Sequence, residues 1–226
     1  MSATLPSRRS LYATAVGKKY VMAISGIVLM AYVLTHMVGN LKLYGGAAGM
    51  AAYSEWLREL GEPALPRETV LWGLRVVLVI AFGAHIWAAY ELTKINRRAR
   101  PETYRSKRDF VAADFASRTM RWTGIIVALF VVFHLLDLTW GTANPDFVAG
   151  DPYRNVVASF ERIPVSLAYV IANLALGVHL YHGAWSLFQS LGWVYPWRRR
   201  FAIAFTALIV AGNVSFPLAV LFGVID

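Results

Sequence analysis

The chain contains no cysteine and few charged residues. Without cysteine it forms no disulfide, holds no metal through thiolates and cannot bind an iron–sulfur cluster by itself. Only 15% of its residues are charged and 58% are hydrophobic, whereas an ordinary soluble domain has about 25% charged and about 45–50% apolar residues. This composition excludes a soluble globular domain and indicates a membrane protein.

Five long apolar runs account for most of the sequence. They cover residues 17–41, 67–95, 115–140, 163–191 and 200–224. Each reaches the roughly 20 residues that a helix needs to cross a membrane. We therefore expect an all-α membrane protein, residues 1–226 forming one integral-membrane domain, with five transmembrane helices of which four form a bundle. The start of the chain has no short apolar core before a cleavage site, so we expect no removable signal peptide.

The net charge of +9 is distributed in an alternating way. Lys and Arg gather before the first run, in the very basic connection 96–114, and between the fourth and fifth runs, whereas the other two connections mix them with Asp and Glu. This alternation is typical of membrane topology rather than of nucleic-acid binding. It predicts a cytoplasmic N-terminus and an outside C-terminus. A short helix is expected over 50–60, and no internal repeat is apparent.

All five histidines lie inside four of the apolar runs. They are His36, His85, His134, His179 and His182. An ionisable side chain inside a membrane needs a partner. Counting about 1.5 Å of rise per residue, His36 and His134 lie toward the outer face, and His85 and His179 toward the inner face. The histidines therefore sort into two pairs, one from the first and third runs and one from the second and fourth.

Two histidine pairs stacked across a four-helix bundle predict two bis-histidine haems. Two axial imidazoles leave no open position on the iron, which favours electron transfer over oxygen chemistry. His182 lies one turn after His179 on nearly the same helix face, so either could be the ligand. Small residues would let a macrocycle approach the backbone at Gly39, Gly83, Gly177 and Gly183.

Three arginines near the ends of the runs are candidates for pairing with haem propionates: Arg75, Arg118 and Arg121. Arginines also extend toward the membrane surface without any ligand, which is the plainer interpretation. The histidines have a plainer interpretation too. They could hydrogen-bond to one another in a non-haem transporter or structural anchor, and such a protein would show no visible absorbance.

Several segments resemble one family. THMVGNLK in the first run, LWGLRVVLVIAFGAHIWAAYELT in the second and HLYHGAW in the fourth are similar to the membrane cytochrome b subunit of succinate:quinone oxidoreductases and fumarate reductases. The resemblance covers nearly the whole chain. It is strongest to the class with one five-helix subunit and two haems b, of the actinobacterial type.

The resemblance carries implications for individual residues. In this family the first and third histidine-bearing helices hold one haem, and the second and fourth hold the other. The fourth ligand typically precedes a glycine by four residues, which selects His179 through Gly183 and makes His182 an accessory residue. Some relatives carry an acid for proton transfer two positions before that ligand, where this chain has Gly177.

The resemblance also implies partners. A flavoprotein subunit with FAD would oxidise succinate, and an iron–sulfur subunit would pass electrons through the haems to quinone, most simply menaquinone, in the bacterial cytoplasmic membrane. Glu55 and Ser25 are quinone-site candidates, against plainer interpretations as a solvated charge and a helix-packing hydroxyl. This chain itself would hold no dehydrogenase active site. The cytochrome b subunit of another quinone-linked dehydrogenase is the alternative, and it would place histidines on different helices.

Overall fold

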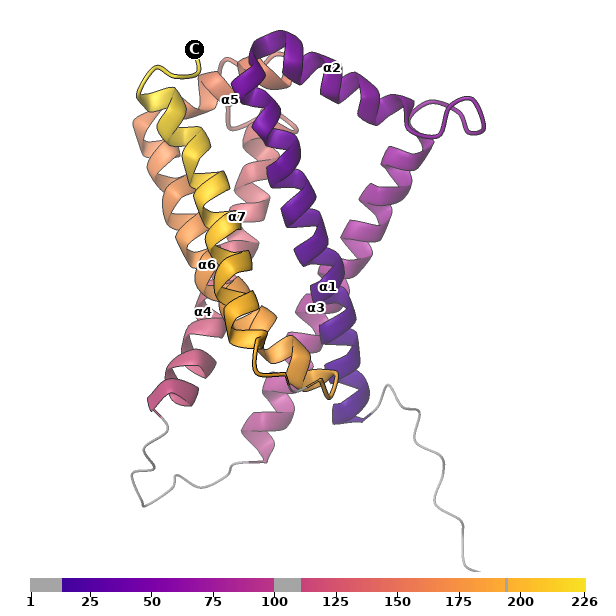
Figure 1. Cartoon of the computed structure of the whole chain (residues 1–226), viewed down its shortest axis with the longest axis vertical. Helices are drawn as coiled ribbons and strands as arrows, with labels where there is room; N and C mark the ends of the chain where they lie inside the picture. Colours follow the sequence, from indigo (N-terminus) through magenta and orange to yellow (C-terminus); the bar gives the residue numbers. More distant parts are fainter. Residues whose placement is uncertain (1–13, 100–110, 194) are drawn as a thin grey trace, which may run out of the picture.

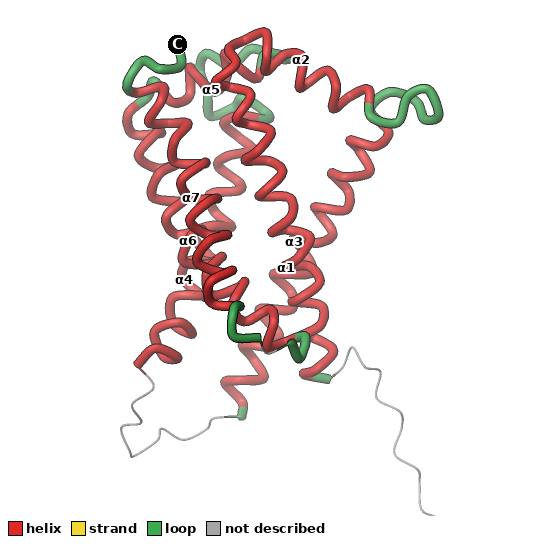
Figure 2. The backbone as a smooth tube through the Cα atoms, in the orientation of Figure 1, coloured by secondary structure: helices red, strands yellow, loops and turns green. Residues whose placement is uncertain are grey.

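The structure is a computed structural model that describes residues 14–99, 111–193 and 195–226, with side chains described outside 111–118. In these ranges the regular structure is helical, without strands (Figure 2). The elements are α1 Ala15–Asn40, the 3₁₀ helix η2 Leu41–Gly45, α2 Gly46–Glu59, α3 Thr69–Arg98, α4 Val111–Leu138, α5 Pro152–Phe160, α6 Ile163–Ser190 and α7 Arg198–Leu221.

Five of these helices are long and apolar enough to cross a membrane: α1, α3, α4, α6 and α7. Their surfaces carry large apolar side chains such as Val79, Leu129 and Ile171, each more than half exposed. A surface of this kind is stable in lipid, because every backbone polar group of a helix is bonded within the helix. The prediction of an all-α protein with five membrane-spanning helices is confirmed.

Helix α5 is a feature that the sequence analysis missed. Asp151 caps it by accepting a hydrogen bond from the Arg154 backbone N–H at 3.0 Å, and Pro152 occupies its first turn. The side chain of Asn155 then accepts from Val148 N at 2.7 Å and donates to Val148 O at 2.8 Å, which ties the preceding loop to the helix. A Gly-, Pro- and Asp-containing connection therefore folds into a capped helix whose inner face is buried.

The long helices associate mainly in pairs. α1 packs on α3, α4 packs on α6, and α6 makes its most extensive contact with α7, which carries no histidine. Helix α2 crosses the end of the bundle from α1 toward α3, at the same end as α5 and the C-terminus (Figure 1). Toward this end α1 and α3 separate, and α2 spans the distance between them.

The helices that carry paired histidines do not pack on each other. Within the ranges that the structure describes, α1 makes no extensive contact with α4, and α3 makes none with α6. The bundle is therefore held together by other helix pairs. The space between α1 and α4, and between α3 and α6, is bridged by side chains rather than by close backbone contact.

Charged residues mark the opposite end of the bundle. Lys18 of α1 forms an ion pair of 2.7 Å with Glu91 of α3, and Lys94 approaches the same carboxylate at 3.2 Å. The most basic connection, predicted over 96–114, falls largely on residues 100–110, which lie outside the described residues. The orientation of the two ends in the membrane stays a prediction.

Candidate functional site

Two histidine pairs lie between the helices at different depths. His36 of α1 faces His134 of α4 with their ring centroids 5.8 Å apart and their planes at 83°. His85 of α3 faces His179 of α6 at 6.2 Å and 70°. We call His36–His134, which is nearer α2 and α5, the outer pair, and His85–His179 the inner pair. These are the two pairs that the depth count predicted.

The spacing within each pair fits one shared metal ion. Imidazole–metal bonds are about 2 Å long, so two imidazoles on opposite sides of an ion have centres roughly 6 Å apart. The measured separations of 5.8 and 6.2 Å match this value. Among the described residues no three His, Cys, Asp or Glu side chains gather as a site for a bare metal ion. Two imidazoles are the protein's full share of a bis-histidine haem, because the porphyrin supplies the other bonds.

His182 does not join the inner pair. Its ring lies against Tyr181, with centroids 5.2 Å apart, while the ring opposite His85 is that of His179. The Nδ1 atom of His182 is buried and has no hydrogen-bond partner among the described groups. The structure thus separates the two candidates for the fourth position, although the role of either as a ligand stays a prediction.

The Nδ1 atom of His85 is held by Ser25, 3.2 Å away on α1. The Ser25 hydroxyl donates its own hydrogen to the Val21 carbonyl at 2.7 Å. With its single hydrogen directed to this carbonyl, Ser25 can accept from Nδ1–H of His85, and the Met22 carbonyl is a second acceptor beside the same imidazole. This assignment by hydrogen-bond accounting leaves Nε2 of His85 with a free lone pair. Ser25, predicted as a quinone-site candidate, therefore has a structural partner in the inner pair.

Thr123 of α4 makes the corresponding contact with His179. Its hydroxyl donates to the Thr119 carbonyl at 2.7 Å and lies 3.5 Å from Nδ1 of His179. By the same accounting the imidazole donates through Nδ1–H and keeps Nε2 free. A ligating histidine in proteins almost always has its second nitrogen bonded in this way, which fixes the tautomer and the ring orientation. Both histidines of the inner pair meet that condition.

His134 of the outer pair is held by a different chain of groups. Its Nδ1 lies 3.3 Å from the Tyr169 hydroxyl, which donates its hydrogen to Asp137 at 2.8 Å. Asp137 is fully buried, accepts from Ser159 and forms an ion pair of 2.6 Å with Arg162. Because the only hydrogen of the Tyr169 hydroxyl goes to Asp137, the His134 imidazole donates through Nδ1–H to the phenol oxygen. Its Nε2 lone pair therefore remains free. The other member of the pair, His36, has Tyr32 stacked on it at 5.3 Å.

The sequence analysis missed Thr123, Tyr169 and Asp137, although a signal for Thr123 was present. The segments MAISGIV at 22–28 and MRWTGII at 120–126 share a methionine, a hydroxyl residue followed by glycine, and an isoleucine. Each hydroxyl residue precedes the histidine of its own helix by eleven positions. This likeness spans seven residues, and the expectation that the chain has no internal repeat stays a prediction.

Two glycines that were not among the expected ones lie beside the inner pair, and the expected Gly83 and Gly183 have no heavy atom of the described residues outside their own helix backbone within 4 Å of an added Cβ atom. A Cβ atom added to Gly26 would lie 3.6 Å from Cε1 of His85, and one added to Gly124 would lie 3.4 Å from Cε1 of His179. Gly39 and Gly177, predicted to make room for a macrocycle, instead face Tyr53 and Val210. These two glycines serve helix packing.

Two of the three arginine candidates have exposed side chains. Arg75 is exposed and lies over the Trp72 ring, with its guanidinium carbon 4.6 Å from the ring centroid. Arg121 is exposed, and the side chain of Arg118 lies outside the described residues. Pairing of these arginines with propionates therefore stays a prediction.

Glu55 lies on α2 in a surface network of ion pairs. It accepts from Arg67 and from Arg58, the latter at 3.5 Å, and its side chain is about half exposed. The hydrogen bond from Arg67 holds the pKa of Glu55 below its usual value. The geometry accounts for Glu55 as a surface ion pair, and its role at quinone stays a prediction.

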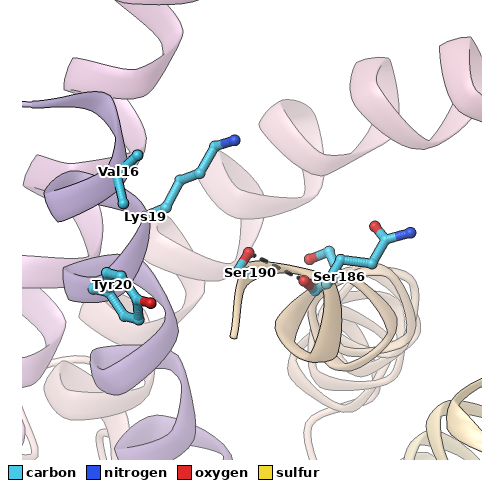
Figure 3. A pocket seen from close by; sticks show the side chains of 6 residues that line it. Val16, Lys19, Tyr20, Ser186 and Ser190 are labelled. Carbon is cyan, nitrogen blue, oxygen red and sulfur yellow. Dashed lines mark hydrogen bonds between the residues drawn. The ribbon is translucent and has the colours of Figure 1, made fainter. Parts of the chain in front are cut away.

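A polar groove of about 340 Å³ opens at the inner ends of α1 and α6. Its lining consists of Val16, Lys19, Tyr20, Ser186, Gln189 and Ser190 (Figure 3). The Ser190 hydroxyl donates a hydrogen bond to the Ser186 carbonyl at 3.1 Å. The lining residues thus offer an ammonium and an amide group near the membrane surface, away from the histidine pairs.

Comparisons with known proteins bear on the whole arrangement. A family model described as succinate dehydrogenase/fumarate reductase transmembrane subunit matches residues 94–216, the range that includes His134 and His179. Comparisons with curated proteins and with solved structures found no match. Because the family match covers more than half of the 226 residues, and five helices are suited to cross a membrane, the chain belongs to the family of succinate dehydrogenase/fumarate reductase transmembrane subunits, the multi-pass membrane subunits of an enzyme complex.

Proposed function

We propose that this chain is a cytochrome b subunit that carries two haems b, one on each histidine pair, and connects a succinate-oxidising or fumarate-reducing dehydrogenase to quinone. The observation that carries the proposal is the pairing itself. Two pairs of imidazoles, each at a spacing that suits one metal ion, lie between helices that do not otherwise pack on each other. A structural role for the histidines would not require that spacing twice.

The protein's part is to present nitrogen lone pairs in fixed positions. His85 and His179 are oriented by hydroxyls on the neighbouring helices, and His134 by Tyr169. When bound, haem iron would supply one-electron redox chemistry between the iron–sulfur subunit and quinone. Along α1 the step from Ser25 to His36 is about 16 Å at 1.5 Å per residue, so the two pairs lie one above the other in the bundle.

The partners follow from the family. Its other subunits would contain the flavin, the iron–sulfur clusters and the dehydrogenase active site, and the basic end near Lys18 and Lys94 would face them from the membrane. The proposal places this end on the cytoplasmic side of a bacterial membrane, in accord with the positive-inside rule. Electrons would then reach the inner pair before the outer pair.

The test of haem binding is a dithionite-reduced minus oxidised absorption spectrum of the detergent-purified complex, with haem quantified per copy of this chain. Two haems b per chain would support the proposal. One haem would leave a single pair as a ligand set, and none would refute the cytochrome function, leaving the histidines as structural groups. The double variant His36→Ala/His85→Ala, which removes one ligand from each pair, is the matched negative control.

The absence of cysteine allows a clean test of orientation. Ala64→Cys lies in the exposed connection after α2, and Ala99→Cys lies at the exposed end of α3. Each variant carries the chain's only thiol. A membrane-impermeant maleimide added to intact cells should label the first and not the second, while both should react in opened membranes. The reverse labelling pattern would refute the proposed orientation.

A further inference from the structure

The chain of groups behind His134 has a feature that the other histidines lack. His85 and His179 lie beside hydroxyls that are bonded to a carbonyl one turn earlier in α1 and α4, whereas His134 lies beside a tyrosine anchored on a buried carboxylate. Asp137 lies one turn after His134 on α4 and has no exposed surface. Its two oxygens accept from three groups, Tyr169, Ser159 and Arg162.

The direction of each hydrogen bond follows from the number of available hydrogens. Arg162 donates to Oδ1 of Asp137 at 2.6 Å, and Tyr169 donates to Oδ2 at 2.8 Å. A carboxylate only accepts, and a phenol has one hydrogen to give. The contact of 3.3 Å between Tyr169 and His134 must then run from Nδ1–H to the phenol oxygen. The carboxylate thus determines, through one tyrosine, which nitrogen of the histidine carries the hydrogen.

The tyrosine ring is fixed independently of its hydroxyl. It packs edge-on against Phe130, Phe133 and Phe160 at centroid distances of 4.9, 6.0 and 4.8 Å. The ring is almost fully buried. A phenylalanine at this position would keep the same ring contacts and lose only the oxygen. The role of the hydroxyl can therefore be separated from that of the ring.

We propose that Asp137 and Tyr169 form a positioning pair that holds His134 as its Nδ1–H tautomer and so tunes the outer haem. This inference rests on the proposed haem-binding function. A hydrogen bond accepted from Nδ1–H makes the imidazole a stronger donor to the metal. A stronger donor favours oxidised over reduced iron, so the pair lowers the midpoint potential of the outer haem.

The test is a redox titration of the intact purified complex, following the haem absorption bands and the low-spin electron paramagnetic resonance signals. The outer haem is identified as the one missing from His36→Ala. In Tyr169→Phe the midpoint potential of the outer haem should rise, and each tenfold change in its reduction equilibrium corresponds to about 59 mV for one electron. The inner haem should keep its potential.

Tyr153→Phe is the matched control. Tyr153 lies on α5 at the same end of the bundle, and its hydroxyl donates to the Asp226 backbone carbonyl at 2.8 Å rather than to a group of the histidine pairs. Removing this hydroxyl should leave both potentials unchanged. Asp137→Asn should shift the midpoint potential of the outer haem in the same direction as Tyr169→Phe. The amide oxygen of asparagine accepts more weakly than a carboxylate oxygen and no longer fixes the hydrogen of the tyrosine.

Each outcome of the titration supports or refutes the positioning role of Asp137 and Tyr169. Loss of the outer haem alone from Tyr169→Phe, with both haems retained in Tyr153→Phe, would also support the positioning role, because the ring packing is conserved. An unchanged outer potential in Tyr169→Phe with both haems bound would overturn the positioning pair and leave the cytochrome function standing. A wild-type complex without haem would instead refute the proposed function itself.

Discussion

Ser25 on α1 and Thr123 on α4 hold equivalent positions on the inner pair. Each hydroxyl lies beside Nδ1 of one histidine, at 3.2 Å from His85 and 3.5 Å from His179. Each is followed by a glycine that faces the same ring. Helices α1 and α4 therefore act at two depths: they orient the inner histidines with a hydroxyl and supply the outer pair eleven residues later.

Removing either hydroxyl should alter the inner haem and leave the outer one unchanged. In Ser25→Ala and in Thr123→Val, the imidazole loses its acceptor and becomes a weaker donor to iron. We expect the midpoint potential of the inner haem to rise in each single variant and to rise further in the double variant. Redox titration of the purified complex measures this.

Thr35→Val is the control for this pair of variants. Thr35 is exposed on α1 and donates to the Ala31 carbonyl at 3.1 Å, the same type of bond within the helix, and among the described groups its hydroxyl makes no hydrogen bond to a histidine ring. Its removal should change neither potential. If Thr35→Val shifted the inner haem as much as Ser25→Ala does, the effect would belong to the helix rather than to the hydrogen bond.

The histidine variants should separate the two haems. His36→Ala or His134→Ala should remove the outer haem and retain much of the inner one, and His85→Ala or His179→Ala should do the reverse, because each iron would lose one of two axial ligands. Haem content per chain and the reduced spectrum measure both losses.

His182→Ala is the informative variant of that series. It should retain both haems, since the ring opposite His85 is that of His179. Loss of the inner haem from His182→Ala, with its retention in His179→Ala, would show that His182 and not His179 is the ligand.

The helices and the histidine pairs were predictable because both depend on distance along the chain. The length of an apolar run gives a membrane-spanning helix, and the position of His36 or His179 within its run gives its depth. What surrounds each histidine depends on helix rotation and on which helices pack, and neither can be read from one run. Thr123, Tyr169 and Asp137 were missed for that reason.

The buried ion pair at the outer end should matter for stability. In Asp137→Ala, Arg162 loses its carboxylate partner, and breaking a buried pair costs about 3–5 kcal/mol. The cost here should lie at or below the low end, because the Arg162 side chain is 27% exposed and water can solvate it. Thermal unfolding of the detergent-purified protein should show a lower midpoint.

Glu55→Gln provides the comparison for that variant. Glu55 pairs with Arg67 at the surface, where solvent screens the charges. The pKa of Glu55 is lowered by this partner, so the carboxylate contributes stability above its unfolded pKa and loses it as the pH falls through the lower folded pKa. At neutral pH the midpoint of Glu55→Gln should stay close to that of the wild type. If the midpoint of thermal unfolding fell equally in Asp137→Ala and Glu55→Gln, the contrast between the buried and the exposed ion pair would be contradicted.

Gly177 of α6 packs closely against Val210 of α7, and substitution there should separate the two helices. A Cβ atom at 177 would lie 2.7 Å from Cγ2 of Val210, too close for a contact, and valine cannot turn aside because its side chain is stiff at χ1. Gly177→Ala should therefore cost about 1–3 kcal/mol, the usual cost of overpacking. The double variant Gly177→Ala/Val210→Ala should be more stable than Gly177→Ala, because it removes the colliding methyl group. Thermal unfolding of both proteins measures the rescue. If the second substitution instead added its own cost in full, the contact between the two residues would not be the source of the loss.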